Sequence, residues 1–162
     1  MKIIVFSDSH GGYNQLEKVY ALHPDADLYL HLGDGERDFD KLILAHSELH
    51  KQILSGGIYR YKHVAGNCDF ASLSPDTDII DACGHRIYAE HGHKSGVKHS
   101  LAQIKLTARR LGCDLAFFGH THIPHYEYDD GLYLLNPGSA LMGCYAIADI
   151  TQKGVLISLA QL

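Results

Sequence analysis

The sequence has no long apolar run and no excess of positive charge. Its first apolar stretch, "IIVFSD", reaches charged Asp8 too soon for the core of a signal peptide, and no stretch is long enough for a membrane-spanning helix. The net charge of −5 does not favour non-specific binding to nucleic acid, which needs an excess of basic residues. We therefore expect a cytoplasmic protein that does not bind membranes. A small phosphate-bearing substrate remains compatible, because bound metal ions can invert the local charge.

Cysteine pairs, repeats and linkers are absent as well. The four cysteines form no Cys-x-x-Cys motif, which predicts reduced thiols: Cys68, Cys83, Cys113 and Cys144. There is no internal repeat, low-complexity tract or Pro/Ser-rich linker, so residues 1–162 are predicted to form a single domain. A chain of 162 residues is too short for a (β/α)8 barrel, which typically needs ~250 residues.

Hydrophobic periodicity predicts alternating strands and helices, followed by hairpins. Strands are expected at 2–7, 27–32, 59–65 and 114–119, and helices at 14–23, 40–54 and 100–112. Hairpins are expected for 77–83 with 86–91, 124–128 with 132–136, and 144–150 with 155–160. This order favours a mixed α/β fold in which helices cover sheets. In such folds ligands bind at the carboxyl ends of the strands.

Metal-ligating side chains collect at the ends of these strands. They are Asp8, His10, Asp34, Asn67, His91, His120 and His122, and glycines lie beside several of them. His120 and His122 are two residues apart, and such residues point to the same side of an extended segment. Imidazoles, carboxylates and an amide oxygen suit Mn, Fe, Zn, Co or Ni rather than Cu(I) or an iron–sulfur cluster. Seven ligands suit two ions that share a carboxylate, which is a known clamp for attack at phosphorus.

Five motifs stand in a fixed order along the chain: "DSH" (8–10), "GD" (33–34), "GNCD" (66–69), "HGH" (91–93) and "GHTH" (119–122). This series resembles the calcineurin-like metallophosphoesterase superfamily. The small size and "NPGS" (136–139) are similar to its compact single-domain phosphodiesterase branch in bacteria and archaea. The resemblance implies a four-layer αββα sandwich of two mixed sheets flanked by helices.

The resemblance also implies residue roles. Asp8, His10 and His122 would hold one metal ion, Asn67, His91 and His120 would hold the other, and Asp34 would bridge them. The implied cofactors are two divalent transition-metal ions, with Mn as the first candidate and Zn, Ni, Co or Fe as alternatives. The implied activity is that of a phosphoesterase, and more narrowly a phosphodiesterase, in which a metal-bridging hydroxide attacks phosphorus. The catalytic residues would be Asp34, Asn67, His91, Cys68 and Asp69.

The third motif departs from the family pattern at Cys68, where the family usually has a histidine. A thiol is a poorer hydrogen-bond donor than an imidazolium. Cys68 therefore either lines the site or is a small residue without chemistry. Asp69 either orients a neighbour or is an ordinary loop carboxylate. His93 is expected to support a ligand rather than bind metal.

The partner is expected to be a small phosphate ester, and a homo-oligomer is left open. The loops at 35–40 and 93–99 are expected to choose the substrate, and the turn at 136–139 is expected to brace the histidine loop. The alternative function is a non-catalytic metal-binding scaffold for protein docking. It would resemble the retromer subunit of the same fold, but this chain keeps Asp34 and Asn67, where that subunit departs from the pattern.

Overall fold

The computed structural model describes residues 1–46 and 60–162. The strands are β1 (Lys2–Phe6), β2 (Leu28–His31), β3 (Tyr61–His63), β4 (Thr77–Ala82), β5 (His85–Glu90), β6 (Leu115–Phe117), β7 (His125–Asp129), β8 (Leu132–Asn136), β9 (Cys144–Thr151) and β10 (Gly154–Gln161). The helices are α1 (Tyr13–Leu22), α2 (Glu36–Ala45), α4 (Ala102–Arg110) and the 3₁₀ helix η1 (Ala140–Met142). None of the described helices is both long and apolar enough to cross a membrane.

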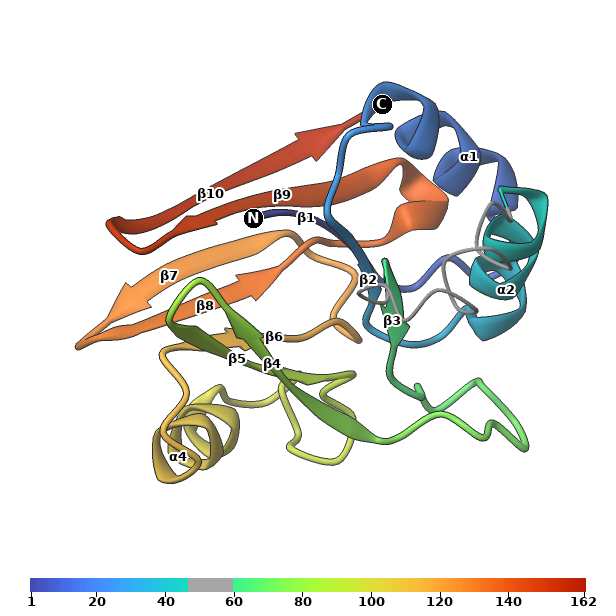
Figure 1. The fold of residues 1–162 in the computed structure, drawn as a ribbon. Coiled ribbons are helices and arrows are strands. Elements are labelled where there is room, and N and C mark those ends of the chain that lie inside the picture. Colours follow the sequence, from blue (N-terminus) through green and yellow to red (C-terminus); the bar gives the residue numbers. More distant parts are fainter. Residues whose placement is uncertain (47–59) are drawn as a thin grey trace.

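The strands form two mixed five-stranded sheets. The first has the order β10-β9-β1-β2-β3, in which β1, β2 and β3 are parallel and β9 and β10 are antiparallel (Figure 1). The second has the order β4-β5-β6-β8-β7, with a parallel centre of β5, β6 and β8 and an antiparallel strand at each edge. The three expected hairpins are all present.

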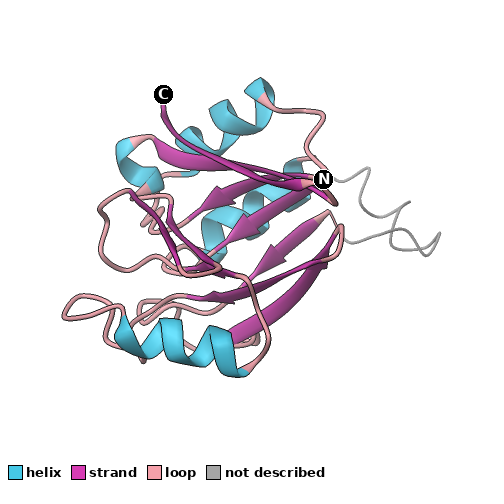
Figure 2. Cartoon of the chain, turned by 90° about the vertical axis from the view of Figure 1, so that its left-hand side faces the viewer, coloured by secondary structure: helices cyan, strands magenta, loops and turns pink. Residues whose placement is uncertain are grey.

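Three apolar clusters hold four layers together. One lies between the two sheets, and the others pack helices α1 and α2 on the first sheet and α4 on the second. Strand β1 contributes to two of these clusters. Its Ile3 and Val5 face the second sheet, whereas Ile4 and Phe6 face the helices, as the two-residue period of a strand requires. Figure 2 shows helices on the outer faces of the sheets. The expected αββα sandwich is confirmed.

Helix α2 is the clearest departure from the sequence prediction. It begins at Glu36, whereas the pattern predicted a start at residue 40, and residues 47–54 of the expected helix lie outside the described residues. The early start has a long-range cause, because the Asp69 carboxylate accepts the N–H groups of Gly35 and Glu36 at 2.9 and 3.0 Å. These are amides that a helix N-terminus leaves without partners. The expected substrate loop at 35–40 is therefore mostly helix.

The loops after β1, β2, β5 and β6 meet where the ends of the two sheets come together. The Asp8 N–H donates to the Gly33 carbonyl at 3.0 Å, which ties the loops after β1 and β2. The Gly119 N–H donates to the His91 carbonyl at 3.0 Å, which ties the loops after β5 and β6. A third bond crosses between the sheets, from the His120 N–H to Asp8 Oδ2 at 3.0 Å. The fold thus brings the predicted ligands to one place.

Candidate metal centre

Left-handed backbone conformations concentrate at the place where the predicted ligands meet. Among the described residues, eight that are not glycine have positive φ, and five of them are predicted ligands: Asp8 (55°), His10 (42°), Asp34 (58°), His120 (66°) and His122 (62°). This region is costly for residues with a Cβ atom, and such conformations cluster at functional sites. The sequence gives no signal of it, because these residues are not glycines.

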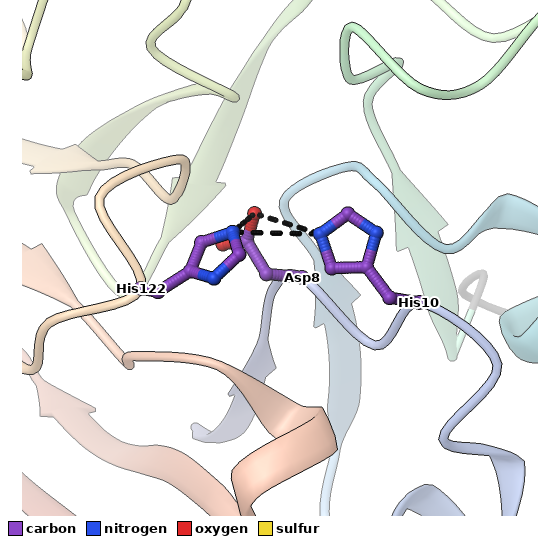
Figure 3. Close-up of side chains that lie close together, drawn as sticks. All are labelled: Asp8, His10 and His122. Atoms are coloured by element: carbon purple, nitrogen blue, oxygen red, sulfur yellow. Dashed lines mark hydrogen bonds and ion pairs between the residues drawn. The ribbon is translucent and has the colours of Figure 1, made fainter.

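Asp8, His10 and His122 form the first ligand group (Figure 3). His122 Nε2 lies 3.2 Å from Asp8 Oδ1 and 3.4 Å from His10 Nε2, and His10 Nε2 lies 3.9 Å from Asp8 Oδ1. Ligands bound at about 2.0–2.2 Å in tetrahedral geometry stand about 3.3–3.6 Å apart. The spacing in this group is close to that of one coordination shell.

Asn67, His91 and His120 form the second group, around His91 Nε2. This nitrogen lies 3.2 Å from Asn67 Oδ1 and 3.2 Å from His120 Nδ1. His91 Nδ1 lies 2.7 Å from the Leu32 carbonyl oxygen, to which it donates a hydrogen bond. That bond leaves the Nε2 lone pair facing the centre, as in metal-bound histidines that are oriented by an outer carbonyl.

Asp34 lies between the two groups. Its Oδ2 is 3.8 Å from His10 Nε2 and 3.4 Å from His91 Nε2, and its Oδ1 accepts the Cys68 N–H at 2.6 Å. Burial alone would raise the pKa of Asp34, but the hydrogen bonds from His91 and Cys68 outweigh it and lower this pKa well below its usual range. An ionised carboxylate with one oxygen aimed at both groups is suited to bridging two cations.

An unpaired buried acceptor indicates that the centre suits cations. Asp8 Oδ1 is buried and has no hydrogen-bond partner among the described residues, which is costly unless a cation or proton neutralises it. Burial raises the pKa of Asp8 in spite of the nearby histidines. Burial also lowers the pKa of His120 to about 4, which keeps its lone pair available. Oxygen and imidazole donors of this kind suit divalent transition metals.

Asp69 orients the loop that carries Asp34. Its two carboxylate oxygens accept four backbone N–H groups, including those of Asp34 at 2.7 Å and Gly66 at 2.9 Å. Burial would raise the pKa of Asp69, but these four bonds outweigh it and lower the pKa. Gly66 is required here, because a Cβ atom at that position would collide with Asp34 Oδ1. Of the two expectations for Asp69, the contacts favour the orienting role.

Cys68 and His93 lie at the margin of the centre. The Cys68 thiol is exposed, and it groups with His10 and Asp34 closely enough to serve as a ligand atom. Burial together with the carboxylates of Asp34 and Asp69 raises the pKa of this thiol. The His93 ring centre lies 5.4 Å from that of His91 and 6.2 Å from that of His120, and His93 belongs to none of the ligand groups in the described chain.

The expected brace at residues 136–139 is present. Buried Asn136 donates from Nδ2 to the Gly119 carbonyl at 2.7 Å and to Thr121 Oγ1 at 3.0 Å, which fixes the loop that carries His120 and His122. Ser139 Oγ donates to the Asp8 carbonyl at 2.8 Å. One short turn therefore holds ligand loops from both sheets.

Sequence reasoning missed a second brace around His31. Its side chain is fully buried; Nδ1 accepts the Gly33 N–H at 3.2 Å, and Nε2 lies 3.2 Å from Ser9 Oγ. Ser9 Oγ in turn donates to Asp38 Oδ2 at 2.7 Å. The same Asp38 oxygen accepts the Gly11 N–H at 2.8 Å. This chain of bonds joins the loop of Asp34 to the loop of Asp8. The only available signal was a histidine inside an otherwise apolar strand.

A hollow of about 350 Å³ opens beside the centre. It is lined by His10, Gly11, Asp34, Gly35, Glu36, Arg37, Asp38, Cys68, Asp69 and Phe70. The first turn of α2 and the segment after Asn67 therefore form its walls. The expected loop at 93–99 does not border it, although residues 93–95 border a smaller hollow that His91 also lines. Phe70 was not among the expected residues.

Comparison with known proteins agrees with this geometry. Residues 1–153 match a family model described as the calcineurin-like phosphoesterase superfamily domain. The chain is 35% identical over 140 residues to the probable metallophosphoesterase YsnB of Bacillus subtilis, and the match covers 86% of this chain and 75% of the relative. These matches confirm the resemblance inferred from the five motifs.

Solved structures share the fold. A conserved protein of Streptococcus pneumoniae, described as a predicted phosphoesterase, superposes with a TM-score of 0.78 at 24% identity and covers 99% of this chain and 88% of its own. A novel archaeal phosphodiesterase gives 0.66 at 17% identity, with coverage of 99% and 100%. Vps29 from Entamoeba histolytica complexed with Zn²⁺ gives 0.70 at 20% identity, with 99% coverage of both chains. At such identities the likeness is one of fold alone.

Proposed function

This chain belongs to the calcineurin-like phosphoesterase superfamily, and we propose that it is a phosphodiesterase that binds two divalent transition-metal ions. The observation that carries the proposal is the position of Asp34. Its Oδ2 lies 3.8 Å from His10 Nε2 and 3.4 Å from His91 Nε2, so one oxygen faces both ligand groups. Manganese is the first candidate ion, with Zn, Ni, Co or Fe as alternatives.

The residues of the chain would hold the ions and present the phosphate to them. When bound, the two cations supply positive charge beside the phosphate oxygens and lower the pKa of water. Asp8, His10 and His122 would hold the first ion, and Asn67, His91 and His120 the second. Asp69 and His31 keep the loops of Asp34 and Asp8 in place. The proposed substrate is a small phosphate ester.

A diester suits the surroundings better than a monoester. The hollow beside the centre carries the carboxylates of Glu36, Asp38 and Asp69 and the guanidinium of Arg37. These carboxylates repel a dianionic monoester more strongly than a monoanionic diester. Cys68 stands where the family usually has a histidine, and its thiol donates hydrogen bonds poorly. The proposed enzyme would therefore depend on a good leaving group. The fold shared with an archaeal phosphodiesterase supports this reading.

The test is metal-dependent hydrolysis. Protein stripped with a chelator would receive Mn, Zn, Co, Ni or Fe in turn and be assayed on bis-p-nitrophenyl phosphate and on p-nitrophenyl phosphate. We expect up to two ions per chain by elemental analysis and faster hydrolysis of the diester. Asp34→Asn is the active-site control, and Asp25→Asn, which changes an exposed carboxylate, is the matched control. Absence of stoichiometric metal after loading would contradict the proposal.

The second candidate is a metal-binding docking scaffold. It is favoured by Cys68 at the family's histidine position and by the fold shared with Vps29. Full metal occupancy without hydrolysis of any aryl diester would support the scaffold. We also propose a cytoplasmic location, in keeping with four cysteines that are all free thiols.

A further inference from the structure

The ring of Phe70 is presented to solvent at the edge of the hollow beside the metal centre. The residue is 86% exposed, although large apolar side chains are usually buried. It borders the same hollow as His10, a predicted ligand of the first ion, and Asp34, the predicted bridge between the two ions. A ring at this position would contact whatever group the substrate carries beyond its phosphorus atom.

Backbone hydrogen bonds hold the segment that carries this ring in a fixed relation to the centre. Asp69, its neighbour, accepts four backbone N–H groups, and Cys68 donates its N–H to Asp34 Oδ1 at 2.6 Å. The Phe70 N–H donates to the Cys68 carbonyl at 3.1 Å. The segment that carries the ring is therefore tied to the proposed bridging ligand. The backbone of such a binding surface needs little ordering when a ligand arrives.

The charges in the hollow restrict what can lie against Phe70. Asp38 accepts the Ser9 hydroxyl and the Gly11 N–H, and Asp69 accepts four backbone N–H groups, so both act as hydrogen-bond acceptors at the hollow. Glu36 accepts the Ser74 hydroxyl at 3.0 Å. A second phosphate or a carboxylate in this space would be repelled. An uncharged flat ring would not, and it would gain from stacking on the phenyl face.

Arg37 offers the matching polar contact. Its side chain borders the hollow from the first turn of α2, and it makes no ion pair or side-chain hydrogen bond with any residue that the structure describes. A guanidinium at this edge can donate to the carbonyl or ring-nitrogen acceptors of a base. A volume of about 350 Å³ also lies within the range of small-ligand pockets.

We propose that the hollow binds an ester arm ending in a nucleobase-like aromatic ring, stacked on Phe70 with its polar edge toward Arg37. The proposal rests on the proposed phosphodiesterase function and names its substrate class: a phosphodiester of a nucleoside. Phe70 is then a specificity-determining residue. It would contact the ester group that stays on phosphorus, not the leaving group.

The test uses two substrates with the same leaving group. Thymidine 5′-p-nitrophenyl phosphate and methyl p-nitrophenyl phosphate both release p-nitrophenolate and differ only in the other arm. Metal-loaded wild-type protein should prefer the thymidine ester. In Phe70→Ala, kcat/KM for the thymidine ester should fall about 5- to 100-fold, mostly through KM, since that range corresponds to the worth of one base–aromatic stack. Methyl ester hydrolysis should change less than about twofold, within the range of a surface change.

The chain offers a matched control in Leu73. This residue is three positions further along the same segment and fully exposed, but it borders a different hollow with Tyr61 and His63. Leu73→Ala should leave both substrates unchanged. Phe70→Tyr and Phe70→Trp should retain the preference for thymidine. Calorimetric binding of thymidine 5′-methylphosphonate to the metal-loaded protein gives a readout without turnover, and Phe70→Ala should weaken it by the same factor.

Three outcomes overturn the proposal. One is a wild-type protein without preference for the thymidine ester. Another is an equal loss on both substrates in Phe70→Ala, which would make Phe70 a support of the metal centre. The third is an equal effect of Phe70→Ala and Leu73→Ala, as expected if this segment docks a protein. Failure of the wild type to hydrolyse either ester contradicts the proposed phosphodiesterase instead, and the phosphonate binding then decides the stacking separately.

Discussion

The metal centre has an inner side and an outer side that are held in different ways. The inner side consists of Asp8, Asp34 and His91, which are at most 3% exposed. Each is bonded to the backbone: Asp8 accepts the His120 N–H, Asp34 accepts the Cys68 N–H, and His91 donates to the Leu32 carbonyl. The outer side consists of His10 and His122, whose side chains are 28% and 47% exposed. Their ring contacts are with each other and with Asp8 and Asp34.

This difference in burial and hydrogen bonding indicates the order in which the site would be assembled. The inner residues hold their positions through the fold, so they form a rigid half-shell before any cation arrives. Among the residues that the structure describes, none outside the centre hydrogen-bonds to the rings of the outer histidines, and a cation would give them their fixed partner. We therefore expect mutations on the two sides to fail in different ways.

The largest effect is expected for Asp34→Asn. The substitution keeps the shape but removes a negative charge shared by both ligand groups, so both sites should lose affinity together. Hydrolysis of an aryl diester should fall by more than ~10²-fold, beyond the loss typical of a residue that only supports a ligand. No single histidine change should cost as much. Calorimetric metal titration beside the activity assay measures it, and near wild-type turnover at saturating metal would show that Asp34 does not bridge.

The histidines provide the sharpest contrast between the sides. His91→Ala leaves the Leu32 carbonyl without its donor and opens a buried space, so added imidazole should not restore activity. His122→Ala removes an exposed ring, and imidazole in the buffer should restore part of the lost rate. We expect His91→Ala to lose about 10²-fold and His122→Ala about tenfold. Rescue of His91→Ala, or a greater loss in His122→Ala, would break the comparison.

Asp69→Asn should weaken the inner side without touching a ligand. The amide can accept fewer of the four backbone N–H groups and has lost the charge that they stabilise. Metal affinity should fall about 10- to 100-fold, as for other residues that orient ligands. Asp129→Asn changes a partly exposed carboxylate that pairs with Lys105; it is the control and should leave metal affinity unchanged. An unchanged affinity in Asp69→Asn would mean that the loop of Asp34 is held by other contacts.

Acid should lower the free energy of unfolding through His31, which braces the loops of Asp8 and Asp34. Burial lowers the pKa of His31 to about 3, whereas an unfolded histidine titrates near 6.5. The unfolded state therefore binds more protons between pH ~6.5 and ~3, and the unfolding free energy falls as the pH falls through this window. The contribution of His31 amounts to at most ~1.4 kcal/mol per pH unit.

Urea unfolding of the chelator-treated protein at several pH values measures this slope. His31→Gln keeps an acceptor and a donor but does not titrate, so its stability should fall less steeply with acid by up to that amount. His99→Gln, at an exposed position, should keep the wild-type slope. Equal slopes in His31→Gln and wild type would show that His31 does not stay neutral in the fold.

The smallest effect is expected for Cys68→Ala on aryl diesters. If no side chain protonates the leaving oxygen, rates should depend steeply on leaving-group pKa, and removal of the thiol should change aryl-ester turnover by less than about threefold. Cys68→His should raise the rate on alkyl diesters, which need the proton. Loss of aryl-ester hydrolysis in Cys68→Ala with both ions bound would give the thiol a part in the chemistry or in phosphate positioning.

The meeting of the candidate ligands in one place could be predicted from the sequence, because these residues follow strands and stand beside glycines. The layers of sheet and helix could be predicted because the hydrophobic period of a strand differs from that of a helix. The start of α2 could not, since Asp69 caps it from 33 positions beyond Glu36. His31 could not, because nothing local shows which way a strand histidine faces. Phe70 could not, because an apolar residue in a polar loop has no pattern around it.

The left-handed backbone at five candidate ligands has a consequence for protein engineering. Such conformations cost of the order of 1–3 kcal/mol each in residues that carry a Cβ atom. Glycine would relieve the cost at positions 8, 10, 34, 120 and 122, and would delete a metal ligand each time. Asp8 and Asp34 also accept partly buried backbone N–H groups that glycine would leave unpaired, so a directed-evolution screen that selected only for heat resistance should enrich glycine first at the more exposed positions 10 and 122 and return stable, inactive proteins. Selection for this scaffold has to include turnover in every round.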